Sequence, residues 1–215
     1  MPRRVVSVSN DQIYHVFNRG VEKRDIFKQP RDYQRFLQTV YYYQYLGPKP
    51  KFSVLSKINF EKFNPSTDSM LVDIYAYCLM PNHFHFLLKQ IKDNGVAIFI
   101  SQFINSYTRY FNTKYSRIGH LFQGSYKVVL VEDEEQFLHL SRYIHLNPRI
   151  ASPTQDLDSY KWSSWNQYTL GKAGLCNTKE ILGMITVENY KDFVHEQIEY
   201  AESLHKLKHK LIDIE

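Results

Sequence analysis

Two β-prone segments separated by one short turn lie in the middle of the chain, and this pair constrains the fold more than any other feature. Met70 to Leu79 alternates loosely and is rich in β-forming residues, and His83 to Lys89 contains the apolar run Phe86-Leu87-Leu88. Between them stands Pro81-Asn82, a pair typical of a tight turn. We therefore expect an antiparallel hairpin whose second strand lies in the core of a sheet.

The remaining elements flank this hairpin. Hydrophobic periodicity and turn residues predict, in chain order, a strand over 13–18, a helix from Pro30 to Gly47-Pro48, a helix after Asn94-Gly95, a strand over 125–131 and a helix from Glu132 to Asn147. The last helix should end at Asn147, because a proline disfavours the helical conformation of the residue before it.

This order of elements predicts an α+β fold, with a ferredoxin-like antiparallel sheet and helices on one face. Residues 48–69 are polar and rich in Pro and Lys, which indicates a loop or a protruding hairpin. After Pro153 we expect an aromatic loop around Trp162 and Trp165, then one or two helices, the last over about 187–212. The chain is thus expected to divide into a domain over 1–150 and a helical C-terminal extension over 151–215.

Composition narrows the class of protein. The 215 residues are 43% hydrophobic and 15% aromatic, which is ample for a packed core. No apolar run approaches the roughly 18 residues of a membrane span, and the N-terminus lacks the apolar block of a signal peptide. The two cysteines are too few for a disulfide framework or a thiolate zinc site. We expect a soluble, cytoplasmic protein with no membrane partner.

Charge is unevenly distributed along the chain. The net charge is +5, but residues 1–60 alone carry eleven Lys or Arg and four Asp or Glu. A second basic stretch runs from Lys89 to Lys127 with Asp93 as its one acid, and aromatic residues interrupt it, as over 107–111. Such residues can bind phosphates and stack on unpaired bases, although a solvated face beside core aromatics explains the pattern equally well.

His83-Phe84-His85 is the first chemical signal. Side chains alternate along a strand, so both imidazoles should point to one face and Phe84 to the other. Two neutral imidazoles form half of a divalent-metal site, whereas the alternative is two histidines on a polar sheet face. A two-histidine phosphoesterase would need Ser or Thr at the third position, twice in the chain, and that pattern is absent.

The end of the last predicted helix is the second signal. Residues four apart share a helix face, so His139, Tyr143 and Asn147 should line one polar stripe. The Asn147 carbonyl can supply a hard oxygen ligand, and the Tyr143 phenol is then placed as a nucleophile toward a metal-polarised phosphate. Alternatively, Tyr143 is a packing residue and Asn147 a helix cap. Together with the histidine pair, the stripe predicts phosphodiester chemistry.

Five segments carry a family resemblance: Tyr14-His-Val-Phe-Asn-Arg-Gly20, Cys78-Leu-Met-Pro-Asn-His-Phe-His85, Gly119-His-Leu-Phe-Gln-Gly-Ser-Tyr-Lys127, Tyr143-Ile-His-Leu-Asn-Pro148 and Trp162-Ser-Ser-Trp165. On these residues the chain resembles the single-tyrosine HUH transposases (IS200-like transposases), most closely their REP-associated tyrosine transposase branch. The resemblance implies a monomer or homodimer that uses Mg²⁺ or Mn²⁺ to nick single-stranded DNA beside a hairpin, the palindromic repeat.

Carried over residue by residue, the resemblance implies that His83 and His85 match the metal-binding pair and that Asn147 matches the third protein ligand. Tyr143 matches the nucleophile, which would leave a 5′-phosphotyrosine and a free 3′-hydroxyl. A phenol has an ordinary pKa of about 10 and needs a proton acceptor at neutral pH. Metal-bound oxygen, solvent and His139, a possible base, stay open for this role.

Candidate DNA contacts flank these residues in the sequence: Arg19, Lys89, His120, Gln123 and Lys127. Ser125 stands where many relatives have Arg, and Arg149-Ile-Ala-Ser-Pro153 replaces their usual continuation, so both departures bear on DNA recognition. Two other functions fit the same residues: a domesticated, non-catalytic DNA-hairpin-binding protein and a metal-dependent phosphodiesterase that uses water. Replacing Tyr143 by Phe separates the three.

Overall fold

The computed structural model describes residues 8–58, 63 and 65–197. Its centre is a four-stranded sheet in the order β2-β3-β1-β4, in which every neighbouring pair is antiparallel. The strands are β1 (Ile13–Arg19), β2 (Val72–Met80), β3 (His83–Gln90) and β4 (Lys127–Leu130). The order and the two helical crossovers are those of a ferredoxin-like βαββαβ unit, so the predicted α+β class is confirmed.

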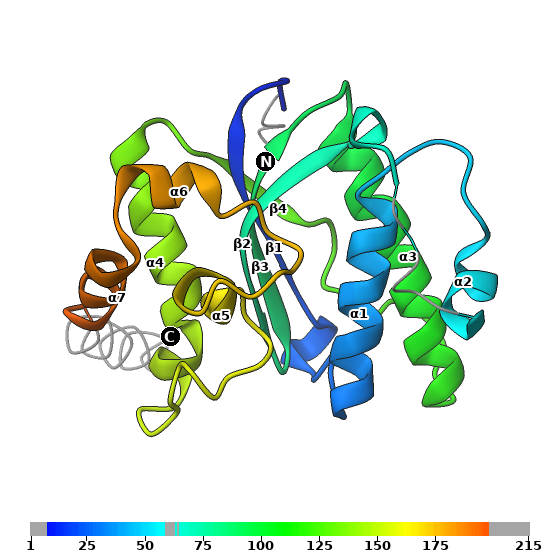
Figure 1. The fold of residues 1–215 in the computed structure, drawn as a ribbon. Helices are drawn as coiled ribbons and strands as arrows, with labels where there is room; N and C mark the ends of the chain where they lie inside the picture. The colour runs from blue at the N-terminus through cyan, green and yellow to red at the C-terminus, as the bar shows by residue number, and fades with distance from the viewer. Residues whose placement is uncertain (1–7, 59–62, 64, 198–215) are drawn as a thin grey trace, which may run out of the picture.

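Helices cover both faces of this sheet (Figure 1). They are α1 (Pro30–Tyr43), α2 (Phe52–Ile58), α3 (Gly95–Lys114), α4 (Glu134–Ala151), α5 (Trp165–Thr169), α6 (Lys179–Met184) and α7 (Val187–His195), with 3₁₀ turns η1 (Val21–Lys23) and η3 (Thr67–Ser69). None of the helices within the described ranges is both long and apolar enough to cross a membrane.

The expectation of helices on one face alone needs correction. Phe84, Phe86 and their neighbours form one core with α1 and α3. Cys78, Met80 and Leu87 point the opposite way and form a second core with α4 and the C-terminal helices. Since β2 and β3 carry apolar side chains on both faces, two helical layers are needed to bury them.

Residues 48–69, expected as a loop or a hairpin, contain the helix α2 and the turn η3. Phe52 and Leu55 of α2 are buried in a small cluster with Tyr42 and Phe63. This short helix therefore forms because two apolar residues one turn apart find a hydrophobic partner on α1. Residues 59–62 and 64 lie outside the described part of the chain.

The C-terminal region begins as expected, with helices following the aromatic segment. Trp165 and Tyr190 are fully buried against α4, so the extension is part of the second core. The predicted helix over 187–212 is present as α7 up to His195, and residues 198–215 lie outside the described ranges.

Helix α4 does not end at Asn147 but continues through Pro148 to Ala151. Proline lacks the N–H that would donate to the Ile144 carbonyl. The side-chain Nδ2 of Asn147 donates instead to the carbonyls of Tyr143 (2.8 Å) and Ile144 (3.5 Å). These bonds partly replace the missing donor, which allows a buried proline inside the helix.

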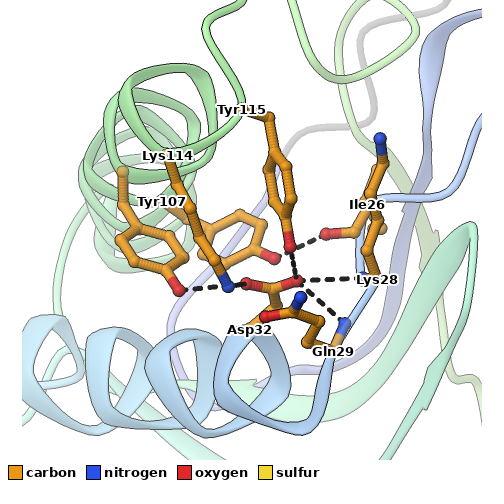
Figure 2. A network of polar contacts seen from close by, with 8 residues as sticks. Ile26, Lys28, Gln29, Asp32, Tyr107, Lys114 and Tyr115 are labelled. Carbon is orange, nitrogen blue, oxygen red and sulfur yellow. Dashed lines mark hydrogen bonds and ion pairs between the residues drawn. The ribbon is translucent and has the colours of Figure 1, made fainter.

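A buried carboxylate, Asp32, joins the start of α1 to the end of α3 (Figure 2). It accepts hydrogen bonds from two backbone N–H groups that precede α1 and from three side chains of α3 and the residue after it: Lys28 N, Gln29 N, Tyr110 Oη, Lys114 Nζ and Tyr115 Oη. Burial raises the pKa of Asp32, but these hydrogen bonds, that from Lys114 foremost, outweigh burial and leave the pKa below 3.8.

Candidate functional site

The turn between β2 and β3 fixes the position of His83. As predicted, Pro81-Asn82 closes a two-residue hairpin. The Pro81 carbonyl accepts from Ile26 N (2.8 Å), and Asn82 Nδ2 donates to the Lys23 carbonyl (3.1 Å). The turn is thereby anchored to the segment that follows β1, so the first residue of β3 has a defined place at one end of the sheet.

His83 and His85 lie on one face of β3, with ring centroids 5.1 Å apart, while Phe84 is buried in the opposite core. Each ring has its Nδ1 engaged by a neighbour. His83 Nδ1 lies 2.6 Å from Asn82 Oδ1, and His85 Nδ1 lies 2.9 Å from His15 Nε2. Any ligand of these imidazoles must therefore bind through Nε2.

Both histidines are neutral at physiological pH. Burial lowers the pKa of His83 to about 4; the charge of Arg19 adds to this effect, and a hydrogen bond with Asn147 opposes it. Burial, followed by the charges of His15 and His83, holds the pKa of His85 well below its ordinary value. Neutral imidazole is the form that binds metals, so protonation does not compete with a ligand near pH 7.

His15 on β1 is a site residue that sequence reasoning missed. It is 8% exposed, its ring stacks on His85 with centroids 5.1 Å apart, and burial lowers its pKa to about 4. The pairing of β1 with β3 sets Phe17 opposite His85, so His15 is the diagonal neighbour on the same face. A single histidine in a strand carries no such signal until the register between the strands is known.

Tyr143 approaches the two histidines from α4. Its ring lies edge-on to His85 and His15, at centroid distances of 5.8 and 6.2 Å. The side chain is 42% exposed, whereas Ile144 beside it is buried and anchors the helix on the sheet. Burial raises the pKa of Tyr143 above 10, so the phenol is protonated at neutral pH.

Asn147 lies one turn after Tyr143 and is 8% exposed. Its side chain donates through Nδ2 to the Tyr143 carbonyl and opposes the lowering of the His83 pKa. Among the described residues there is no group of three or more His, Cys, Asp or Glu that could hold a metal. Two imidazoles and the amide oxygen of Asn147 would form a three-ligand set with open positions, which fits Mg²⁺ or Mn²⁺.

His139 does not join this group, although it lies on the same side of α4. Its Nδ1 is 2.6 Å from Arg142 Nη2, its ring is 5.4 Å from that of Phe193, and its Nε2 is 3.8 Å from Glu135. These contacts connect His139 to α7 and to the solvent side of α4, and none of its contacts with described residues involves Tyr143.

Three of the five candidate DNA contacts lie beside the histidines. Arg19 is the cross-strand partner of His83, and the backbone N of Gln123 donates to the Arg19 carbonyl at 2.7 Å. Lys127 Nζ lies 5.9 Å from the ring of Phe17, which stacks on a site histidine. All three side chains are exposed, and they add two positive charges and one amide to this end of the sheet.

The other two candidates differ in their positions relative to the histidine pair. Lys89 is six residues beyond His83, about 20 Å along β3, and forms an ion pair with Asp11 at 3.7 Å. His120 is exposed in the loop between α3 and β4, and its carbonyl accepts from Arg117 at 3.4 Å. Lys89 is therefore close to His83 in the sequence but far from it in space, because both residues lie on the same extended strand.

Comparisons with known proteins bear on this arrangement. Residues 49–147 match the family model described as "Transposase IS200 like", and this range contains His83, His85, Tyr143 and Asn147. The resemblance to the IS200-like transposases that the motifs predict is therefore confirmed over these residues. A comparison with curated proteins gave no significant match.

A solved structure described as a REP-associated tyrosine transposase bound to a REP hairpin matches the chain in three dimensions. The TM-score is 0.54 at 12% sequence identity, over 83% of this chain and 90% of that one. At this identity the match establishes a shared fold. Because the match covers far more of the chain than residues 49–147, that fold extends beyond the range of the family model.

Proposed function

Because residues 49–147 match the IS200-like transposases, we propose that this protein cleaves and rejoins single-stranded DNA beside a hairpin through a covalent phosphotyrosine. One observation carries the proposal: the Tyr143 ring lies edge-on to the ring of His85 at a centroid distance of 5.8 Å, and Asn147 follows one turn later on the same helix. The hairpin as substrate is taken from the similar structure, which is described as bound to one.

His83, His85 and Asn147 would hold the divalent cation. The fit is supported by two neutral imidazoles whose Nδ1 atoms are already engaged and by an amide whose Nδ2 donates to the helix backbone. When bound, Mg²⁺ or Mn²⁺ supplies Lewis-acid polarisation of a phosphate oxygen.

Tyr143 is the proposed nucleophile. Its Oη forms a bond to the scissile phosphorus as the bond from phosphorus to the 3′ oxygen breaks, which yields a 5′-phosphotyrosine and a strand ending in a 3′-hydroxyl. The phenolic proton must leave, and the 42% exposure of Tyr143 supports water as its acceptor. The contacts of His139 with Arg142 and Phe193 disfavour that histidine as the base.

The remaining residues would position the DNA. Arg19 and Lys127 offer positive charge to phosphates, and Gln123 offers an amide to base edges at the same end of the sheet. Lys89 would contact DNA farther from the cleaved bond, and His120 would contact DNA from the loop that precedes Gln123. We assign catalysis to residues 1–150 and a supporting role to 151–215, because α5 and α7 pack against α4.

The decisive test is Tyr143→Phe, assayed with hairpin oligonucleotides labelled at the 5′ or the 3′ end in the presence of Mn²⁺. Wild type should form a denaturant-stable protein–DNA adduct that carries the 3′ label, because the downstream fragment is the one bonded through its 5′ phosphate. The variant should form none. Tyr126→Phe, a half-buried tyrosine outside the site, is the matched control and should form the adduct normally.

Two outcomes would contradict the proposal. Hydrolysis by the Tyr143→Phe variant without an adduct would identify a phosphodiesterase that uses water. Hairpin binding by wild type without either cleavage or adduct, in Mg²⁺ and in Mn²⁺, would identify a non-catalytic binding protein.

A further inference from the structure

A groove with a volume of about 940 Å³ lies between α1, α2 and α3. Of these helices, α1 and α3 cover the face of the sheet opposite to α4 and Tyr143, and α2 packs against α1 (Figure 1). Four cationic side chains line the groove, and we call it the basic groove: Arg35, Lys51, Arg109 and Lys114. Lys51 and Arg109 are exposed, while the other two are half-buried.

Arg35 is held in place by aromatic rings. Its guanidinium carbon lies 4.2 Å from the ring centroid of Phe52 and 5.2 Å from that of Tyr110. Its Nε is buried and has no hydrogen-bond partner among the described residues. Burial lowers the pKa of Arg35; Tyr110 and Tyr43 oppose this effect, and the charge of Arg31 adds to it. The guanidinium of Arg35 thus packs against two rings where it lines the groove, and a guanidinium is a group that binds anions well.

The charges of the groove are not compensated within the described part of the protein. The four ion pairs between described residues include neither Arg35 nor Lys51 nor Arg109. The nearby carboxylate, Asp32, already accepts from Lys114 and from two tyrosines. The groove therefore carries three positive charges for which the described residues supply no counter-charge.

We infer that the basic groove binds the phosphate backbone of DNA. The ring of Tyr110 already has Arg35 and Lys114 near it, at 5.2 and 5.6 Å from its centroid, so it holds cations rather than offering a free surface to bases. Contacts between cationic side chains and phosphates hold the DNA backbone but do not distinguish one base sequence from another. The choice of DNA as the polyanion rests on the proposed function.

This inference also explains the mixed basic and aromatic segment over residues 107–111. Tyr107 and Phe111 are buried in the core, whereas Arg109 and Tyr110 line the groove. Because the groove lies across the sheet from Tyr143, DNA held there is a part of the substrate distant from the cleaved bond, such as the hairpin stem.

The test uses the full-length protein with Lys51→Glu and Arg109→Glu combined. Both side chains are exposed, so the variant should keep the wild-type thermal unfolding. The control combines Lys172→Glu and Lys179→Glu, which change the net charge equally at exposed positions outside the groove. Binding of a hairpin oligonucleotide is measured by fluorescence anisotropy over a series of NaCl concentrations.

The groove variant should bind at least about tenfold more weakly than the control. Its slope of log affinity against log salt should be shallower by about 0.7 to 0.9 for each phosphate that the variant no longer neutralises. Arg35→Lys keeps the charge but removes the flat guanidinium, and it should weaken binding to a smaller extent. Equal affinity and equal slope for the groove and control variants would overturn the inference.

The outcome for the groove is separable from that for the catalytic site. Adduct formation on a short single strand that lacks the stem should be the same in the groove variant as in wild type. If wild type forms no adduct but the groove variant still loses hairpin affinity, the proposed function fails and the inference stands. If wild type forms adducts but the groove and control variants bind hairpin DNA with equal affinity, the proposed function stands and the inference about the groove fails.

Discussion

The hydrogen bond between His15 and His85 depends on which of the two facing ring nitrogens carries a proton. Their nitrogens Nε2 and Nδ1 are 2.9 Å apart, so one must donate and the other accept. His85 can bind a cation through Nε2 only if its Nδ1 carries the proton and donates to His15. His15, which burial keeps neutral, is thus the partner that selects this tautomer and orients the ring.

Replacing His15 by Ala should lower the affinity for Mn²⁺ by about 10- to 100-fold, the usual effect of removing such a partner. The affinity can be measured without DNA by electron paramagnetic resonance of free Mn²⁺. His15→Gln, whose side-chain oxygen can accept the same bond, should recover part of the loss. His120→Ala, in an exposed loop, serves as the control. If His15→Ala binds Mn²⁺ as tightly as this control, His15 has no role in holding the cation.

Among the elements, α4 is the one on which the proposed chemistry depends, and a buried polar network holds it. His145 Nδ1 lies 2.8 Å from Tyr190 Oη on α7, and its Nε2 lies 2.7 Å from Ser164 Oγ. Ser141 Oγ lies 2.9 Å from the same Tyr190 hydroxyl. All four side chains are 0% exposed, so this combination of Ser, His and Tyr connects helices and cannot reach a substrate.

Tyr190→Phe should destabilise the protein by about 1–3 kcal/mol, because it removes the buried hydroxyl that contacts both Ser141 Oγ and His145 Nδ1. Urea unfolding measures the loss. Tyr160→Phe is the control, because it also removes a tyrosine hydroxyl, in this case one that donates to the backbone carbonyl of Leu79 at 2.6 Å. A loss for Tyr190→Phe no larger than that of the control would show that the network adds nothing to the anchoring of α4.

At the scale of the whole molecule, the described part of the chain forms one sheet between two helical layers, and each layer has its own polar connection. For the layer of α1 and α3 that connection is Asp32 (Figure 2). Because the pKa of Asp32 is below 3.8 in the folded protein, the carboxylate stabilises the fold above the unfolded-state pKa. That stability is lost as the pH falls through the lower, folded-state value.

Asp32→Asn should therefore destabilise the protein by about 3 kcal/mol at pH 7, where Lys114 loses its buried partner. The difference from wild type should shrink as the pH falls below about 4, since protonation then removes the same charge from wild type. Thermal unfolding between pH 3 and pH 7 measures this. Asp68→Asn, at an exposed position, should show no such trend, and a pH-independent difference for Asp32→Asn would contradict the assignment.

The sequence alone was sufficient for features that depend on local periodicity. The alternation in β3 predicts that His83 and His85 share a face, and the four-residue spacing in α4 predicts that Tyr143 and Asn147 do. The turn at Pro81-Asn82 follows from the preferences of those two residues. In each case the neighbours that matter are a few positions away, so the chain's own geometry decides the outcome.

Tertiary structure decided what depends on partners far along the chain. Strand register brings His15 to His85, and the second layer of helices appears because both sheet faces are apolar. Lys89 lies far from the site because distance accumulates along a strand, and α4 passes Pro148 because the side chain of Asn147 supplies substitute donors. Local propensity is worth at most a few kcal/mol, so packing and hydrogen bonding between distant residues override it.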